Sequence, residues 1–303
     1  MRKPDGRVVL RRVAIGLGVA LLLATASMAH YAFLPWLPIK PGYRAHRFAS
    51  GTVYVRRNAA RAQGYAALDS IVAAVEQFHG IAFKRRVDIY VTSEWRQFNR
   101  GALQGWNGAP RPVLGAAMQT GDAIYVSPLA ARSAPQGVLA HELCHALLYQ
   151  YVGLRESFAL HRERWLLEGL AVHVGNPASY LTDATFDSLT AAHPEWVVSI
   201  ASDSAATFTP SELAGPFRLT EYRRFIAWLI ERDGHPRLRR LIREAIATPS
   251  DVRDAFARTY ATPLAVASEE FASELHMGRR RNRRPRSITT SVWPPTVRPV
   301  AGR

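Results

Sequence analysis

The distribution of apolar residues separates a strand-rich first half of the chain from a helix-rich second half. Residues 87–93 (VDIYVTS) are β-branched and aromatic, which predicts a strand. Two short apolar runs, 113–119 and 123–128, are separated by Thr-Gly-Asp and predict a hairpin. Residues 66–80 have helical periodicity, and the pattern is helical again from 217 to 277. Strands followed by helices indicate an α+β fold.

Two apolar segments in the middle of the chain predict buried helices. The first, 137–152 (GVLAHELCHALLYQYV), follows Pro135, and proline favours the first turn of a helix. The second is expected over 162–175 and contains WLLEGLAVHV. The charged run between them, LRESFALHRER, is expected to be a solvated loop that leads into the second helix. The stretch 181–216 has a weak pattern and is rich in loop-forming residues.

The start of the chain predicts a membrane anchor. Residues 1–12 hold five Lys or Arg and one Asp, and the next charged residue is Lys40. The uncharged run between them is long enough to cross a bilayer, which needs about 20 apolar residues. We interpret 13–37 as a single-pass signal-anchor in a bacterial cytoplasmic (inner) membrane, with the N-terminus cytoplasmic and the body exported to the periplasmic side. The alternative is a signal peptide cleaved near Ala26 or Ala29, which would release a secreted protein.

The rest of the chain is expected to form one domain. We expect a linker at 38–50 and a domain over 51–277. Its parts are an α/β part at 51–134, two helices at 135–176 and a helical part at 217–277. A chain of 303 residues, 48% of them hydrophobic, is long enough to build a sizeable core.

The net charge of +15 is concentrated at the two ends of the chain. Residues 1–12 contribute +4, and residues 278–303, with eight Arg and no acid, contribute +8. The body carries the remaining +3, so no specific binding of nucleic acid is indicated. The tail is expected to be a disordered extension, with contact to an anionic membrane surface or another polyanion as the alternative. Arginine outnumbers lysine 36 to 3, which suggests a bacterial source.

The candidate chemistry lies in His-Glu-Leu-Cys-His at 141–145. Residues four apart lie on one face of a helix, so His141 and His145 can bind one metal ion, and Glu142 can reach a water molecule on that ion. Two histidines and a carboxylate base are the arrangement of zinc hydrolases. The alternative is two core histidines bonded to backbone groups, with Glu142 in a salt bridge. Cys144 is the one cysteine, so an intrachain disulfide is excluded, and we interpret it as a small buried hydrophobe.

A catalytic zinc site needs a third protein ligand. The downstream candidates are Glu156, His161, Glu163, Glu168 and His173. Glu168 stands in an apolar helix, where a carboxylate is costly unless it is paired or bound to a metal. Gly169 follows it and allows another backbone to come close. We therefore choose Glu168 as the third ligand; the alternative is a buried Glu168 paired with an arginine.

The order H-E-x-x-H followed by W-x-x-E-G-x-A resembles the gluzincin metallopeptidases, and in particular the bacterial peptidase MA-like domains. The resemblance covers roughly residues 85–277 and includes the helical C-terminal part. It implies a zincin-like fold and one zinc ion (Zn2+) held by His141, His145 and Glu168. It also implies that Glu142 is the general base.

The chain departs from the gluzincin pattern in three places. Twenty-two residues separate His145 from Glu168, which implies a long intervening segment. His173 stands where the family often has a tyrosine. The run GAAMQT at 115–120 resembles the substrate strand of gluzincin aminopeptidases but lacks their amine-binding glutamate. This last departure favours an endopeptidase.

Together these observations predict a membrane-anchored zinc endopeptidase acting on peptides or proteins. The substrate is expected to add as a strand along Val113–Met118. A hydrogen-bond donor to the oxyanion is needed besides the metal, and the candidates are Tyr222 and His173. Two alternatives stay open. One is a catalytically inactive binding module of the same fold, and the other is an anchored module whose basic ends bind anionic lipid or polymer around a structural metal.

Overall fold

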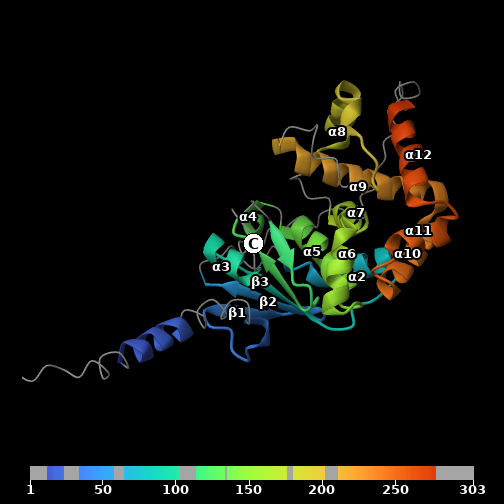
Figure 1. The fold of residues 1–303 in the computed structure, drawn as a ribbon. Helices are drawn as coiled ribbons and strands as arrows, with labels where there is room; N and C mark the ends of the chain where they lie inside the picture. Colours follow the sequence, from blue (N-terminus) through green and yellow to red (C-terminus); the bar gives the residue numbers. More distant parts are fainter. Residues whose placement is uncertain are drawn as a thin grey trace, which may run out of the picture.

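A mixed sheet is followed along the chain by a helical region (Figure 1). The structure is a computed structural model, and it describes residues 12–23, 34–57, 65–102, 114–133, 135–175, 180–201 and 211–277. Its first half comprises η1 (Leu34–Trp36), β1 (Tyr43–Arg47), β2 (Gly51–Arg56), α2 (Leu68–His79), β3 (Val87–Val91), α3 (Trp95–Gly101), β4 (Gly115–Ala117) and β5 (Ala123–Val126).

The second half is helical. It comprises α4 (Ala130–Ser133), α5 (Pro135–Tyr149), α6 (Leu154–Arg162), α7 (Arg164–Gly175), α8 (Asp183–Ala192), η3 (Pro194–Trp196), α9 (Ser211–Asp233), α10 (His235–Ala247), α11 (Val252–Tyr260) and α12 (Leu264–Met277). The predicted α+β class and the start of the first buried helix at Pro135 are therefore confirmed.

The five strands found among the described residues lie in the order β1-β2-β3-β5-β4. The pairs β2/β3 and β3/β5 are parallel, whereas β1/β2 and β4/β5 are antiparallel. The hairpin predicted from Thr-Gly-Asp is therefore present, and the Met118 N–H donates to the Ala123 carbonyl at 2.8 Å. This topology leaves β4 at one end of the strand order, beside the helix that carries the two candidate histidines.

The two faces of the sheet bury different side chains. Valine and isoleucine from β2, β3 and β5 face α2 and α5 and join the main core. The alternate positions Tyr90 and Tyr125 face the other side, where they pack with Phe98 of α3 and Leu34 of η1. Successive side chains of a strand point to opposite faces of the sheet, so a strand that is covered on both faces buries apolar side chains at every position. It explains the nearly continuous apolar runs that predicted β3 and β5.

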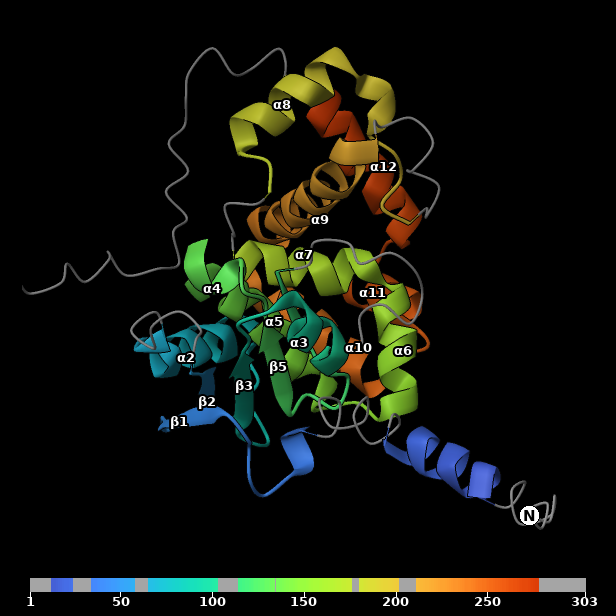
Figure 2. The same cartoon turned by 90° about the vertical axis from the view of Figure 1, so that its left-hand side faces the viewer.

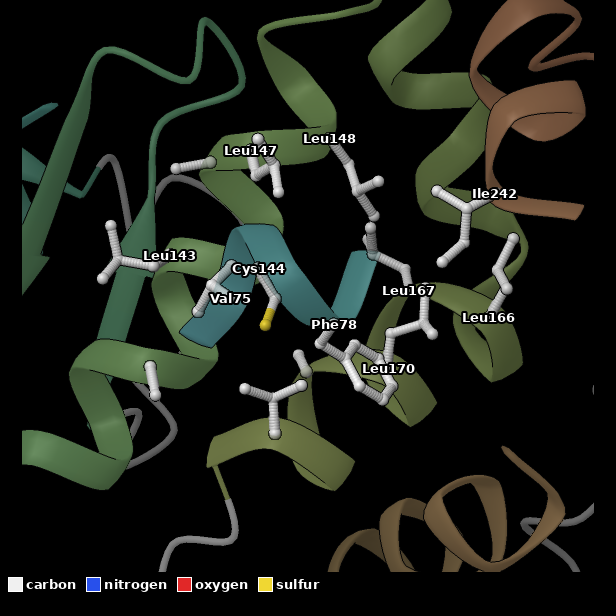
Figure 3. Close-up of a cluster of buried hydrophobic side chains, with 14 of the residues drawn as sticks. Val75, Phe78, Leu143, Cys144, Leu147, Leu148, Leu166, Leu167, Leu170 and Ile242 are labelled. Carbon is white, nitrogen blue, oxygen red and sulfur yellow. The ribbon is translucent and has the colours of Figure 1, made fainter. Parts of the chain in front are cut away.

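The helices that follow are stacked outward from the sheet. Helix α5 packs on β4, β5 and α2, and α7 lies between α5 and α9 (Figure 2). A cluster of buried side chains joins α2, α5, α7 and α10 (Figure 3). Cys144 lies in this cluster near Val75 and Leu143 and is fully buried, as expected for a small hydrophobe.

Three segments differ from the sequence-based expectations. The expected linker 38–50 contains β1, which pairs with β2. Four of its five residues are exposed, so it carries no apolar alternation that would have predicted a strand. The charged run before the second helix is α6, which buries Ser157 and Leu160, so α7 begins at Arg164 rather than at 162. The weak stretch 181–216 contains α8, whose N-cap Thr182 accepts a hydrogen bond from the Thr185 N–H at 3.2 Å.

The predicted anchor is described only in part. Residues 12–23 form a helix, and 24–33 lie outside the described residues. Among the residues that are described, no helix combines the length and the apolar character that crossing a bilayer requires. The basic segment 1–11 and the tail 278–303 also lie outside the described residues. The anchor over 13–37 and the role of the tail therefore stay predictions.

Candidate metal centre

Helix α5 brings the two histidines of the H-E-x-x-H sequence together. The Nε2 atoms of His141 and His145 lie 3.1 Å apart, and both side chains are buried. The helix around them is buried from Val138 to Tyr149, because one side packs on the sheet and α2 and another on α7. The one-face arrangement predicted from the four-residue spacing is confirmed.

Helix α7 supplies the third group. The Glu168 Oε2 lies 3.5 Å from the His141 Nε2 and 3.8 Å from the His145 Nε2. The end of α7 comes close to α5 because Gly175 has no side chain: a Cβ there would lie 2.6 Å from the Gly137 carbonyl oxygen and 2.9 Å from the His141 Cβ. Glu168 thus faces the histidines, rather than an arginine as the alternative proposed.

The three groups fit one metal ion. Their candidate ligand atoms all lie within 4.8 Å of one another. Ligands at about 2.0–2.1 Å from a tetrahedral zinc ion are about 3.3 Å apart, and the three observed separations, 3.1, 3.5 and 3.8 Å, bracket that value. His141, His145 and Glu168 therefore form a buried group, consistent with a zincin-like site, that can hold one metal ion.

Two of the three groups have the protonation states that metal ligands need, whereas the pKa of His141 is raised, because its hydrogen bond with Glu168 and the charges of Glu142 and Glu168 outweigh the effect of burial. Burial lowers the pKa of His145 to about 3. For Glu168, burial raises the pKa, but the hydrogen bond with His141 and the electrostatic interactions with the two imidazoles and Arg164 outweigh it and lower the pKa to about 2. His145 is therefore neutral and Glu168 ionised at neutral pH. A metal site requires a neutral imidazole and a carboxylate.

The surroundings of the two imidazole Nδ1 atoms differ from those in many metal-bound histidines. Within the described part of the chain, the Nδ1 atoms of His141 and His145 are buried without a hydrogen-bond partner. Metal-bound histidines usually donate this second N–H to a carboxylate or a carbonyl. Here an aromatic ring lies beside each imidazole ring. The centroids of the Tyr149 and His145 rings, which are stacked, are 6.3 Å apart, and those of Tyr180 and His141 are 6.1 Å apart.

Glu142 contacts strand β4 and interacts electrostatically with His141 and Glu168 of the metal group. Its Oε2 accepts a hydrogen bond from the Ala117 N–H of β4 at 2.9 Å. Burial raises the pKa of Glu142 to about 7, although the nearby His141 and the Ala117 N–H act in the opposite direction. A buried carboxyl group next to a metal group, with a pKa near neutrality, has the properties of a general base.

Two residues named from the sequence lie on α9 and α7. Tyr222 is buried, its hydroxyl accepts a hydrogen bond from the Arg218 Nε at 3.2 Å, and the guanidinium lies over its ring. His173 stacks on Phe78 with ring centroids 5.2 Å apart, and its pKa is lowered to about 4 by burial and by Arg223 and His235. A catalytic role for either residue stays a prediction.

Two tyrosines near the metal group were missed. The pKa of Tyr149 and of Tyr180 is raised by burial and by the charges of Glu168 and Glu142, so both hydroxyls lie in the field of the two carboxylates. Tyr149 is four residues after His145, a helical spacing that could have revealed it. Tyr180 gave no such signal, because it comes near only after the chain has left α7.

No family model and no curated protein matches this chain. The assignment of the site therefore rests on the geometry and electrostatics of its residues.

Proposed function

We propose that the protein is a zinc-dependent peptidase that hydrolyses internal peptide bonds of a peptide or protein substrate. The observation that carries the proposal is the convergence of His141, His145 and Glu168 from two helices, with Glu142 one residue away and directed to an edge strand. A structural zinc site usually has four protein ligands. Three ligands beside a buried carboxyl group support a catalytic role.

Four residues of the chain would take part in the hydrolysis. His141, His145 and Glu168 hold the ion, and a bound zinc ion lowers the pKa of water and polarises a carbonyl group. Glu142 takes a proton from the attacking water and delivers it to the leaving amine. A pKa of about 7 suits both transfers, since the group then gains and loses a proton near neutral pH.

The edge strand β4 suits an extended substrate. Ala116 pairs with Tyr125 inside the sheet, whereas Gly115 and Ala117 belong to the non-bonded positions of the ladder. Among the described residues, no further strand pairs with the outward side of β4, where a substrate strand could add, although the Ala117 N–H there already donates to Glu142. The absence of an acidic residue in the run 115–120 favours cleavage within a chain over recognition of its amino terminus.

Tyr180 is our candidate donor to the oxyanion. Its ring lies beside His141, and its hydroxyl is within the electrostatic range of both Glu142 and Glu168. Burial and these charges raise the pKa of Tyr180, so the hydroxyl keeps its proton and can donate.

We also propose that this site works outside the cytoplasmic membrane of a bacterium. The uncharged run 13–37 would anchor the chain, and the basic residues before it favour a cytoplasmic N-terminus. The Arg-rich tail 278–303 would contact anionic surfaces.

The experiment compares the detergent-solubilised full chain with its Glu142→Gln and His145→Ala variants. Bound zinc is measured by mass spectrometry, and cleavage is followed with fluorescein-labelled casein. We expect zinc in the first two proteins and cleavage in the first alone. Glu156→Gln, which changes an exposed residue of α6, is the control and should bind zinc and cleave casein. Zinc without cleavage in the unmodified chain would favour the binding module, and full zinc in His145→Ala would overturn the ligand set.

A further inference from the structure

The carboxylate of Glu142 is held by strand β4 at two points. The Ala117 N–H donates to its Oε2 at 2.9 Å. At Gly115, two residues earlier on the same strand, the Glu142 side chain occupies the space that a side chain would fill. A Cβ there would lie 2.6 Å from the Glu142 Cγ and 2.7 Å from its Oε1. The Oε2 atom of Glu142 therefore accepts a hydrogen bond, and its Oε1 atom packs against the Gly115 Cα, which carries no side chain.

The N–H that Glu142 uses is not part of the sheet. The Met118 N–H donates to the Ala123 carbonyl and the Leu114 carbonyl accepts from the Ser127 N–H, so these residues face β5. Ala117 alternates with them and directs its N–H away from β5, to the side of β4 on which no other described strand pairs. The bond to Glu142 therefore uses a donor that no strand among the described residues requires.

The strand itself is fixed to α5 at a second place. Gln150, which follows α5, donates to the Gly121 carbonyl at 2.8 Å in the β4–β5 turn and accepts from the Arg85 N–H at 2.9 Å. A Cβ on Gly121 would lie 2.5 Å from the Ala146 carbonyl oxygen, so the turn contacts the helix backbone. Gln150 and Glu142 are eight residues apart, about two helical turns. The hairpin cannot slide along α5 without breaking both attachments.

We propose that the bare Cα of Gly115 and the N–H of Ala117 position the Glu142 carboxylate for proton transfer, which makes both of them positioning residues. This inference rests on the proposed peptidase function. A flexible glutamate can rotate about three bonds, and a misplacement of about 1 Å in a catalytic group can reduce a rate by about 100-fold. The hydrogen bond and the steric contact together restrict that rotation.

The same N–H has a second conceivable use, because an added substrate strand would also require it. The two uses have different kinetic consequences. Loss of a group that positions the base lowers kcat with little change in KM, whereas loss of a substrate contact raises KM.

The kinetic test uses the zinc-loaded full chain with labelled casein. Gly115→Ala should displace the carboxylate. Ala117→Pro should remove the N–H while keeping the ladder, because proline is tolerated at an edge position whose N–H faces outward. We expect kcat to fall by about 100-fold in each, with zinc content unchanged and KM within about twofold. A rise in KM at unchanged kcat, or no change in either variant, would overturn the proposal.

Two further glycines provide controls. Gly215→Ala meets no atom of the described residues within 4 Å, so its activity should equal that of the parent chain. Gly101→Ala would meet the Tyr125 ring at 2.2 Å on the opposite face of the sheet, away from Glu142. It should lower the melting temperature and leave kcat unchanged below it. A kcat loss in Gly101→Ala as large as in Gly115→Ala would show general distortion of the sheet and overturn the proposal.

A measurement independent of activity separates this inference from the proposed function. Amide hydrogen exchange at Ala117 and Met118 is followed by NMR in the parent chain and in Glu142→Ala. We expect Ala117 to exchange at least about tenfold faster in the variant, and Met118, bonded to Ala123, to keep its rate. Equal Ala117 rates would overturn the contact. Faster exchange in a chain that cleaves nothing would leave the contact standing and refute only the peptidase function.

Discussion

Gly169 lies directly against Tyr222: a Cβ on the glycine would be 2.9 Å from the tyrosine carbonyl oxygen. The same Cβ would be 2.8 Å from the Ile226 Cγ1. At Gly169, the residue that follows the candidate ligand Glu168, the backbone of helix α7 therefore meets the backbone of α9 and the Ile226 side chain. The close approach that the sequence predicted from a glycine at this position is confirmed, and Tyr222 contributes to it through its backbone.

Gly169→Ala should separate α7 from α9 and shift Glu168. Overpacking of this kind typically costs about 1–3 kcal/mol in the free energy of unfolding, measured here by urea denaturation. Zinc affinity, measured by calorimetry, should fall as well. Gly215→Ala on α9 is the matched control, because the added methyl group meets no described atom within 4 Å and should stabilise the helix slightly. Unchanged stability in Gly169→Ala would show that α9 can move away without cost.

Zinc bound to His141, His145 and Glu168 should stabilise the fold. A ligand that binds only the folded state adds about 2.7 kcal/mol at a free concentration 100 times its Kd, so thermal unfolding should shift upward on zinc addition and return after chelation. His145→Ala should abolish the shift. His161→Ala is the control, since this exposed histidine bonds the Tyr149 hydroxyl and is not in the metal group. An equal zinc shift in His145→Ala would contradict the assignment.

Tyr180→Phe tests the oxyanion donor. Loss of one such donor typically lowers kcat by about 100- to 1,000-fold, and zinc content should stay unchanged because Tyr180 is not in the group that can hold the metal. Tyr222→Phe and His173→Gln are compared in the same casein assay. A large loss of kcat in Tyr222→Phe but not in Tyr180→Phe would restore the sequence-based candidate.

The sequence revealed the parts of the site that depend on local spacing. His141 and His145 follow from helical periodicity, and Glu168 from the cost of a carboxylate in an apolar helix. The bond between Glu142 and Ala117 was not predictable, because it joins a helix to a backbone N–H 25 positions away. Tyr180 was missed for a similar reason. Strand β1 was missed because an exposed edge strand has no buried face, and burial is what imposes a period of two.

His79 should make stability depend on pH between 6.5 and 4. It is fully buried, its Nδ1 bonds the Val75 carbonyl at 2.8 Å, and its Nε2 has no partner among the described residues. Burial lowers its pKa from 6.5 to about 4. In this range the unfolded chain binds a proton that the folded chain excludes, so stability is complete above pH 6.5 and is lost as the pH falls toward 4.

The loss due to His79 is roughly 3 kcal/mol over that range, because each pKa unit corresponds to about 1.4 kcal/mol. Urea unfolding of the metal-free protein at a series of pH values measures it. His79→Leu should have a shallower slope between pH 4 and 6.5, since the leucine has no proton to bind, while the contributions of His145 and His173 remain in both proteins. Parallel slopes in the two proteins would mean that His79 accepts a proton in the folded state and that its burial does not keep it neutral.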